Sequence, residues 1–263
     1  MLAAAISLQG PSAVQAQVPP QDVLAIWYRM TLELVRHTPT YTPPVASRSF
    51  AYIGIAAFEA VASGSNSLHS LAGQLNGLTP PPKREAGQTY DEAVVLQAAL
   101  ARMVTTSFAN TGPTGQRAMA SLQAKQQAKV ADGLAPDVVD RSESFGIAVA
   151  DHIIAWSQTD GGAVIDNLGF PQIYTLTEGP AHWVPTSAIR LQQLPLLPNW
   201  GKNRPFAMPS GTACDLPPPL DYSEDPTSAF YAEAKEVFDA KKNLTPDQKA
   251  IAQIGRASCR ERV

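Results

Sequence analysis

The sequence is short of charged residues, of cysteine and of long apolar runs, and each shortage excludes a class of protein. Charged residues make up 16% of the 263 residues, against about 25% in a typical soluble domain. The net charge of −3 argues against a nucleic-acid binder, and two cysteines are too few for a disulfide framework or a zinc cluster. No run of about 18 apolar residues is evident, so we expect no transmembrane segment. The composition favours a protein built largely from buried helices.

The first 160 residues have apolar side chains at the spacing of helices, without strand-type alternation, so the predicted class is all-α. The stretch 47–64 has only Arg48 and Glu59 as charges and should be a central buried helix. We expect the partner of Glu59 to be an arginine from another helix. The two helices on either side of the short 133–135 link should pack as an antiparallel pair. The whole helical bundle should cover residues 20–162. An apolar stripe predicts a helix over 21–37, and a capping box at Thr89–Glu92 predicts the start of another. Prolines should begin helices at Pro113 and Pro136, and glycines should end them at Gly133 and Gly161–Gly162.

Residues 1–16 form an apolar leader that ends in Val14-Gln-Ala16, a spacing that a signal peptidase uses. We interpret it as a probable signal peptide and expect a periplasmic or secreted protein. No basic residue precedes Arg29, so a disordered Ala-rich leader is the alternative.

Proline dominates the segment 163–225, which should be an ordered loop that wraps a core, since eleven of the 23 prolines lie within 163–226. A further helical region should occupy 226–253, where Thr245-Pro-Asp-Gln248 is a second capping box. If the rest of this region is missing, the apolar faces near Phe230, Val237 and Ile251 should be left exposed.

The last ten residues, 254–263, read IGRASCRERV and interrupt this capped helix. One choice of codons for them resembles a common short-read sequencing adapter, read in frame. We therefore interpret 254–263 as an adapter artefact rather than a basic tail, so that the natural sequence would be truncated after residue 253.

Four stretches carry a family resemblance by their order and spacing: SFAYIGIAAFEAV, GLAPDVVDRSESFGIAVADHIIAWSQTDGG, HWVPTSAIRLQQLPLLPNWGKNRPFAM and DPTSAFYAEAKEVFDAKKNLTPDQKAIA. Together they resemble the N-terminal helical region of bacterial vanadium-dependent haloperoxidases, which share a fold with type 2 phosphatidic-acid phosphatases. The resemblance implies the N-terminal part of an α-helical enzyme that holds vanadate, activates hydrogen peroxide and oxidises halide. Some relatives instead hydrolyse phosphate esters at the same oxyanion pocket.

The family's oxyanion site combines a Lys with an Arg-Pro, a Pro-Ser-Gly-His and an Arg followed by His. Here Lys202-Asn-Arg204-Pro205 and Pro209-Ser-Gly-Thr212 imitate the first two pieces, but the spacing is too short and Thr212 stands where His is required. We therefore expect the catalytic residues beyond residue 253, and neither vanadate nor another metal bound by this fragment.

Other residues suggest lesser roles. His182, Trp183, Trp200 and Arg204 are candidates for lining a channel toward the missing site. His152 should be a hydrogen-bonded core histidine rather than a ligand. The alternative to half an enzyme is a self-contained, secreted helical module that binds a ligand under the Pro-rich loop.

Overall fold

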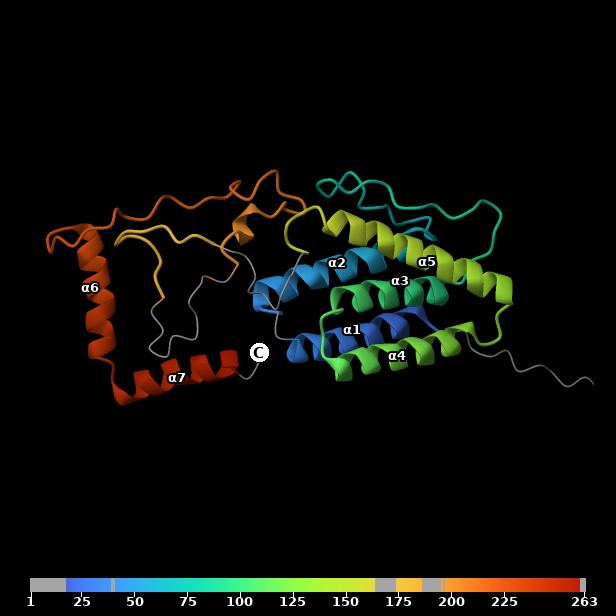
Figure 1. Ribbon diagram of the computed structural model, residues 1–263, viewed down its shortest axis with the longest axis horizontal. Coiled ribbons are helices and arrows are strands. Elements are labelled where there is room, and N and C mark those ends of the chain that lie inside the picture. The colour runs from blue at the N-terminus through green and yellow to red at the C-terminus, as the bar shows by residue number, and fades with distance from the viewer. Residues whose placement is uncertain (1–17, 39–40, 164–173, 186–194, 196, 261–263) are drawn as a thin grey trace, which may run out of the picture.

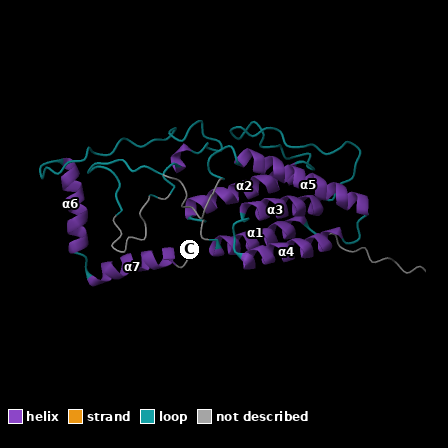
Figure 2. Ribbon diagram, viewed as in Figure 1, coloured by secondary structure: helices purple, strands orange, loops and turns teal. Residues whose placement is uncertain are grey.

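The computed structural model describes residues 18–38, 41–163, 174–185, 195 and 197–260. Across these residues it contains helices, loops and one isolated β-bridge but no strand (Figure 2), so the predicted all-α class is confirmed. The α-helices are α1 (Pro20–His37), α2 (Pro43–Ala62), α3 (Glu92–Ser107), α4 (Pro113–Ala131), α5 (Pro136–Ser157), α6 (Ala229–Lys242) and α7 (Pro246–Arg260).

The helix starts follow from local chemistry. Helices α1, α2, α4 and α5 begin with proline in the first turn, where its missing N–H removes no helical hydrogen bond. The capping box before α7 is confirmed, because the Thr245 N–H donates to Gln248 Oε1 (2.9 Å) and the Gln248 N–H donates to Thr245 Oγ1 (3.2 Å). The capping box predicted at Thr89 is wrong. Asp91 caps α3 instead, since its Oδ1 accepts from the Val94 N–H at 3.0 Å.

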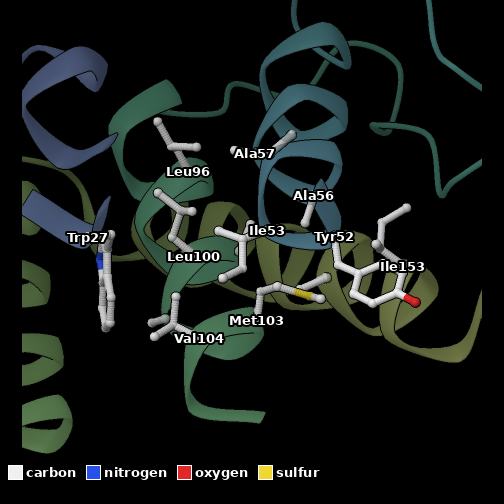
Figure 3. Packing of buried hydrophobic residues seen from close by; sticks show 14 of the residues in the cluster. Trp27, Tyr52, Ile53, Ala56, Ala57, Leu96, Leu100, Met103, Val104 and Ile153 are labelled. Atoms are coloured by element: carbon white, nitrogen blue, oxygen red, sulfur yellow. The ribbon is translucent and has the colours of Figure 1, made fainter. Parts of the chain in front are cut away.

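Helix α3 is the centre of the bundle and packs against α1, α2, α4 and α5. Figure 3 shows Leu100 of α3 beside Ile53 of α2, with Trp27 of α1 on the other side. All three side chains are fully buried, which places the core around α3 on several faces. The sequence has no charge between Glu92 and Arg102, and this long uncharged stretch explains why α3 can be surrounded.

The antiparallel α4–α5 pair predicted from their short link is wrong. Both helices pack on α3 rather than on each other, and the hydrogen bond from Gln127 Nε2 to Glu143 Oε2 (3.0 Å) joins them. Helix α4 buries only a narrow face, Met119, Gln126 and Val130, and it contacts α3 and, less extensively, α1.

Helices α3 and α5 run parallel and in close contact. The Asp91 N–H donates to Ser142 Oγ (2.9 Å) near the start of both helices, and Arg102 Nε donates to Asp151 Oδ1 (2.6 Å) further along. A Cβ atom on Gly146 would lie 2.3 Å from the Val95 carbonyl oxygen. Glycine is therefore required where α5 crosses the backbone of α3.

Helix α2 is buried along most of its length, as predicted. By length and composition it is also the one described helix that could cross a membrane, but 61% of its apolar window is buried inside the bundle. The arginine partner predicted for Glu59 is wrong. Glu59 is 1% exposed, and its Oε1 accepts from the Leu71 N–H at 2.7 Å. A loop backbone folded over the end of α2 satisfies this carboxylate.

Helices α6 and α7 lie apart from the bundle (Figure 1). No described residue of α6 is buried, and the exposed fractions are 72% for Val237 and 68% for Ile251. The exposure of Val237 and Ile251 agrees with the prediction, whereas Phe230 is half-buried, with its ring centre 5.2 Å from that of Tyr222. The helix α7 continues through residues 254–260, whose side chains lie outside the described set.

Candidate functional site

A buried ion pair joins α2 to the chain just after α5. Arg48 Nη2 donates to Asp160 Oδ2 at 2.7 Å, and Arg48 Nε donates to the Tyr52 hydroxyl at 2.7 Å. The Tyr52 hydroxyl in turn donates to Asp160 Oδ2 at 2.6 Å. The Asp160 side chain is 1% exposed and that of Arg48 is 12% exposed. We call these three residues the Arg48–Asp160 cluster.

The local sequence explains why Asp160 reaches this position. Helix α5 ends at Ser157, and Gly161 takes a φ of +88°, a conformation that favours glycine. The Gly162 N–H then donates to Asp160 Oδ1 at 2.8 Å. A Cβ on Gly162 would lie 2.3 Å from Arg48 Nε, so the glycine also makes room for the guanidinium. Asp160-Gly161-Gly162 ends the helix, as the sequence indicates, and also supplies the acceptor for a charge 112 residues away.

The pKa values of Tyr52 and Arg48 are both raised. Burial raises the pKa of Tyr52, and its hydrogen bond to Asp160 raises it further. Burial alone would lower the pKa of Arg48, but its bonds to Asp160 and Tyr52 outweigh burial, and the pKa is raised. The phenol therefore stays neutral and the guanidinium stays charged, and the guanidinium is already paired with Asp160.

The same cluster anchors the Pro-rich segment to the bundle. Arg48 Nη2 also donates to the Arg204 carbonyl (2.7 Å), and the Arg204 N–H donates to the Asp160 carbonyl (2.9 Å). The Arg204 guanidinium donates to Thr159 Oγ1 (3.0 Å) and to the Trp156 carbonyl (3.1 Å). This position at the C-terminal end of α5 favours a cation, because the helix dipole leaves its last carbonyls partly negative.

Aromatic rings and an asparagine complete the anchor. The Arg48 guanidinium lies 4.4 Å from the centre of the Phe206 ring, and Phe206 lies 5.6 Å from Trp156. Asn76 Nδ2 donates to the carbonyls of Pro205 (3.0 Å) and Met208 (2.6 Å). These contacts hold residues 204–208 against the bundle.

The predicted channel-lining residues fall in two groups. Arg204 is in the anchor, and Trp200 begins the short helix η2 (Trp200–Lys202) and packs partly buried against the core. His182 and Trp183 are exposed, and the bonds and ring contacts described above for residues 204–208 do not involve them. Their role as channel residues stays a prediction.

The described residues do not fit a vanadate site. Such an oxyanion needs several convergent cationic donors, whereas the guanidinium groups of Arg48 and Arg204 are already bonded to protein oxygens. Lys202 and Thr212, from the two segments that partly match the family's oxyanion motifs, are exposed. No group of three His, Cys, Asp or Glu side chains that could hold a metal occurs within the described ranges. His152 is hydrogen-bonded as predicted, with Nε2 lying 2.8 Å from the Thr79 carbonyl oxygen, but it is half-buried and not part of the core.

The sequence did not predict the roles of Asp160 and Tyr52 in the Arg48–Asp160 cluster or that of Asn76 in holding residues 205–208. One signal could have indicated the cluster: Arg48 is a lone cation in a largely apolar stretch, and a buried charge requires a partner.

The helical architecture defines a class of fold: the chain is all-α and vanadium-haloperoxidase-like. Among solved structures it is similar to a protein described as the first bacterial vanadium-dependent iodoperoxidase, with 30% sequence identity and a TM-score of 0.70. That match covers 88% of this chain and 54% of the iodoperoxidase chain. This chain therefore spans about half the length of the protein that it matches. No family model matches the chain, and no curated protein matches its sequence.

Proposed function

We propose that the chain is the N-terminal helical part of a vanadium-dependent-haloperoxidase-like enzyme. The observation that carries this proposal is the 30% identity to the iodoperoxidase over 88% of this chain, with a TM-score of 0.70. In the whole enzyme, bound vanadate would supply the centre that activates hydrogen peroxide for halide oxidation. The match favours this chemistry over phosphate-ester hydrolysis, because the matched protein is an iodoperoxidase.

In this proposal, the role of the described residues is structural support for the missing catalytic half. The bundle is closed around α3, and Arg48 and Arg204 are committed to anchoring residues 204–208. The exposed side chains of Val237 and Phe238 on α6 supply an apolar face for further helices of the same protein. An isolated helix of 14 residues is marginal in water, which supports such a partner.

Export to the periplasm or outside the cell is part of the same proposal. It rests on the leader 1–16 and its Val14-Gln-Ala16 site. Both lie outside the described residues. The interpretation of 254–263 as adapter-derived is likewise a proposal.

The test compares two proteins: the chain of 263 residues and a chain extended through the reading frame that continues after codon 253 of the gene. Each is given vanadate, hydrogen peroxide and iodide, and iodide oxidation is followed by absorbance. We expect the shorter chain to match free vanadate, since its described residues offer no oxyanion site, and the extended chain to turn over. Activity of the shorter chain would contradict the proposal that the catalytic residues lie after residue 253. An inactive extended chain would contradict the proposed enzyme.

One observation favours a second candidate, the helical binding module. The bundle contains a pocket of its own, and the ligand that fits this pocket can be inferred from its walls.

A further inference from the structure

A pocket of about 180 Å³ opens at the end of the bundle where α3 and α5 end. The residues that line it include the buried Ser49 and Tyr52 of α2 and Met103 of α3, and the exposed Asn110 and Gln158. We call it the α3–α5 pocket. It adjoins the Arg48–Asp160 cluster through Tyr52, but neither charged residue of the cluster lines it.

The walls of the α3–α5 pocket favour an uncharged ligand. Among the described residues, none that lines it is Asp, Glu, Lys, Arg or His. The charges next to it, Arg48 and Asp160, neutralise each other at 2.7 Å. An ion in the pocket would lose hydration without gaining a partner of opposite charge, which is strongly unfavourable.

Three hydroxyl groups of the pocket, those of Tyr41, Ser107 and Ser157, can accept hydrogen bonds from a ligand. Ser107 Oγ donates to the Met103 carbonyl (2.8 Å), and Ser157 Oγ donates to the Ile154 carbonyl (2.8 Å). The Tyr41 hydroxyl donates to the Ser107 carbonyl. The protons of these hydroxyls are therefore committed, and their remaining lone pairs can only accept. A ligand that brings its own O–H or N–H satisfies them.

The size and the apolar surface of the pocket define the rest of the ligand. An apolar cavity of about 150 Å³ is large enough to hold benzene, so about 180 Å³ accommodates one six-membered ring and a small substituent. The side chains of Met103 and Ile154 and the rings of Tyr41 and Tyr52 provide the apolar contact.

We propose that the α3–α5 pocket binds a small uncharged molecule with an apolar body of about one ring and a single hydrogen-bond donor, with phenol as the simplest example. This site lies in the helical bundle and does not depend on the proposed peroxidase function, so either proposal can fail without the other.

The experiment measures binding of three probes of similar shape to the 263-residue chain by ligand-observed NMR titration. Phenol has the ring and the donor, toluene has the ring alone, and benzoate has the ring and a negative charge. We expect phenol to bind about fivefold more tightly than toluene, the factor that one hydrogen bond contributes, and benzoate to bind more weakly than both.

Two variants with a matched control locate the site. Ser107→Ala and Ser157→Ala each remove an acceptor from the pocket and should reduce the preference for phenol over toluene. The control is Thr105→Ala, because Thr105 Oγ1 makes the same kind of bond to the Ala101 carbonyl (2.6 Å) but does not line the pocket. Thermal unfolding checks that each variant is folded.

Three outcomes would overturn the proposal. They are no saturable binding of phenol, binding of benzoate as tight as that of phenol, and loss of the phenol preference in Thr105→Ala to the same extent as in both serine variants. Retention of the preference in the control, with loss in a folded serine variant, is the result that supports it.

Discussion

Replacing Asp160 by asparagine should destabilise the protein more than any comparable change at a surface ion pair. The Asp160 carboxylate accepts from Arg48 Nη2 (2.7 Å), the Tyr52 hydroxyl (2.6 Å) and the Gly162 N–H (2.8 Å). The Asp160→Asn side chain keeps one carbonyl acceptor but loses the charge, so the largely buried Arg48 cation is left without its counter-ion. Removal of one partner of a buried pair costs about 3–5 kcal/mol, a large fraction of the roughly 5–15 kcal/mol that stabilises a typical domain.

The assay is urea denaturation followed by helical circular dichroism, with Asp151→Asn as the control. Asp151 pairs with Arg102 at 2.6 Å on the surface, where the two side chains are 46% and 49% exposed. Exposed pairs contribute about 0.2–1 kcal/mol, so the control should be nearly neutral. A double variant, Arg48→Met with Asp160→Asn, should recover part of the loss, because it leaves no uncompensated cation. If Asp160→Asn costs no more than Asp151→Asn, the cluster does not hold α2 to the end of α5.

Further predictions concern packing, pH and the leader. Gly146→Ala should force α3 and α5 apart, because its Cβ would lie 2.3 Å from the Val95 carbonyl; we expect a net loss of about 2 kcal/mol in urea denaturation, despite the better helix propensity of alanine. Stability should fall as pH rises above about 10, because the pKa of Tyr52 is raised in the folded state and the unfolded chain loses its phenolic proton first. Tyr52→Phe should flatten that alkaline limb, and an unchanged slope would count against the raised pKa. Export from a Gram-negative host should yield a protein that begins at Gln17 by intact mass, and a mature protein that retains Met1 would contradict the signal-peptide proposal.

Local signals in the sequence predicted the helices well. Proline starts fixed the first residues of α4 and α5, at Pro113 and Pro136, because a missing N–H is harmless only in the first turn. The capping box at Thr245 is likewise a contact within four residues. Each of these features depends on neighbours in the chain, which the sequence places directly.

Long-range partners could not be predicted in the same way. Arg48 and Asp160 are 112 residues apart, and nothing in either local pattern names the other. Glu59 was expected to pair with an arginine but accepts a hydrogen bond from the Leu71 N–H. Every residue except proline has a backbone N–H, so the sequence does not indicate which one will be the donor. The wrong α4–α5 pairing has the same origin: a short link suggested adjacency, whereas burial of α3 on several faces decided the packing.

The sequence predicted only part of the candidate site. The segment around Lys202 was separated from an anion site because its spacing and Thr212 do not match the family, and this interpretation stays a prediction. The channel-lining role expected of Arg204 stays a prediction, and the sequence did not indicate that its guanidinium donates to the Trp156 carbonyl at the end of α5.

Sequencing the gene beyond codon 253 with long reads tests the central proposal most directly. We predict an open frame in place of 254–263 that encodes, in order, a Lys with an Arg-Pro, a Ser-Gly-His and an Arg followed by His, the donors that an oxyanion site requires. Recovery of the IGRASCRERV tail followed by a natural stop codon would contradict the account of this chain as part of a vanadium-dependent peroxidase.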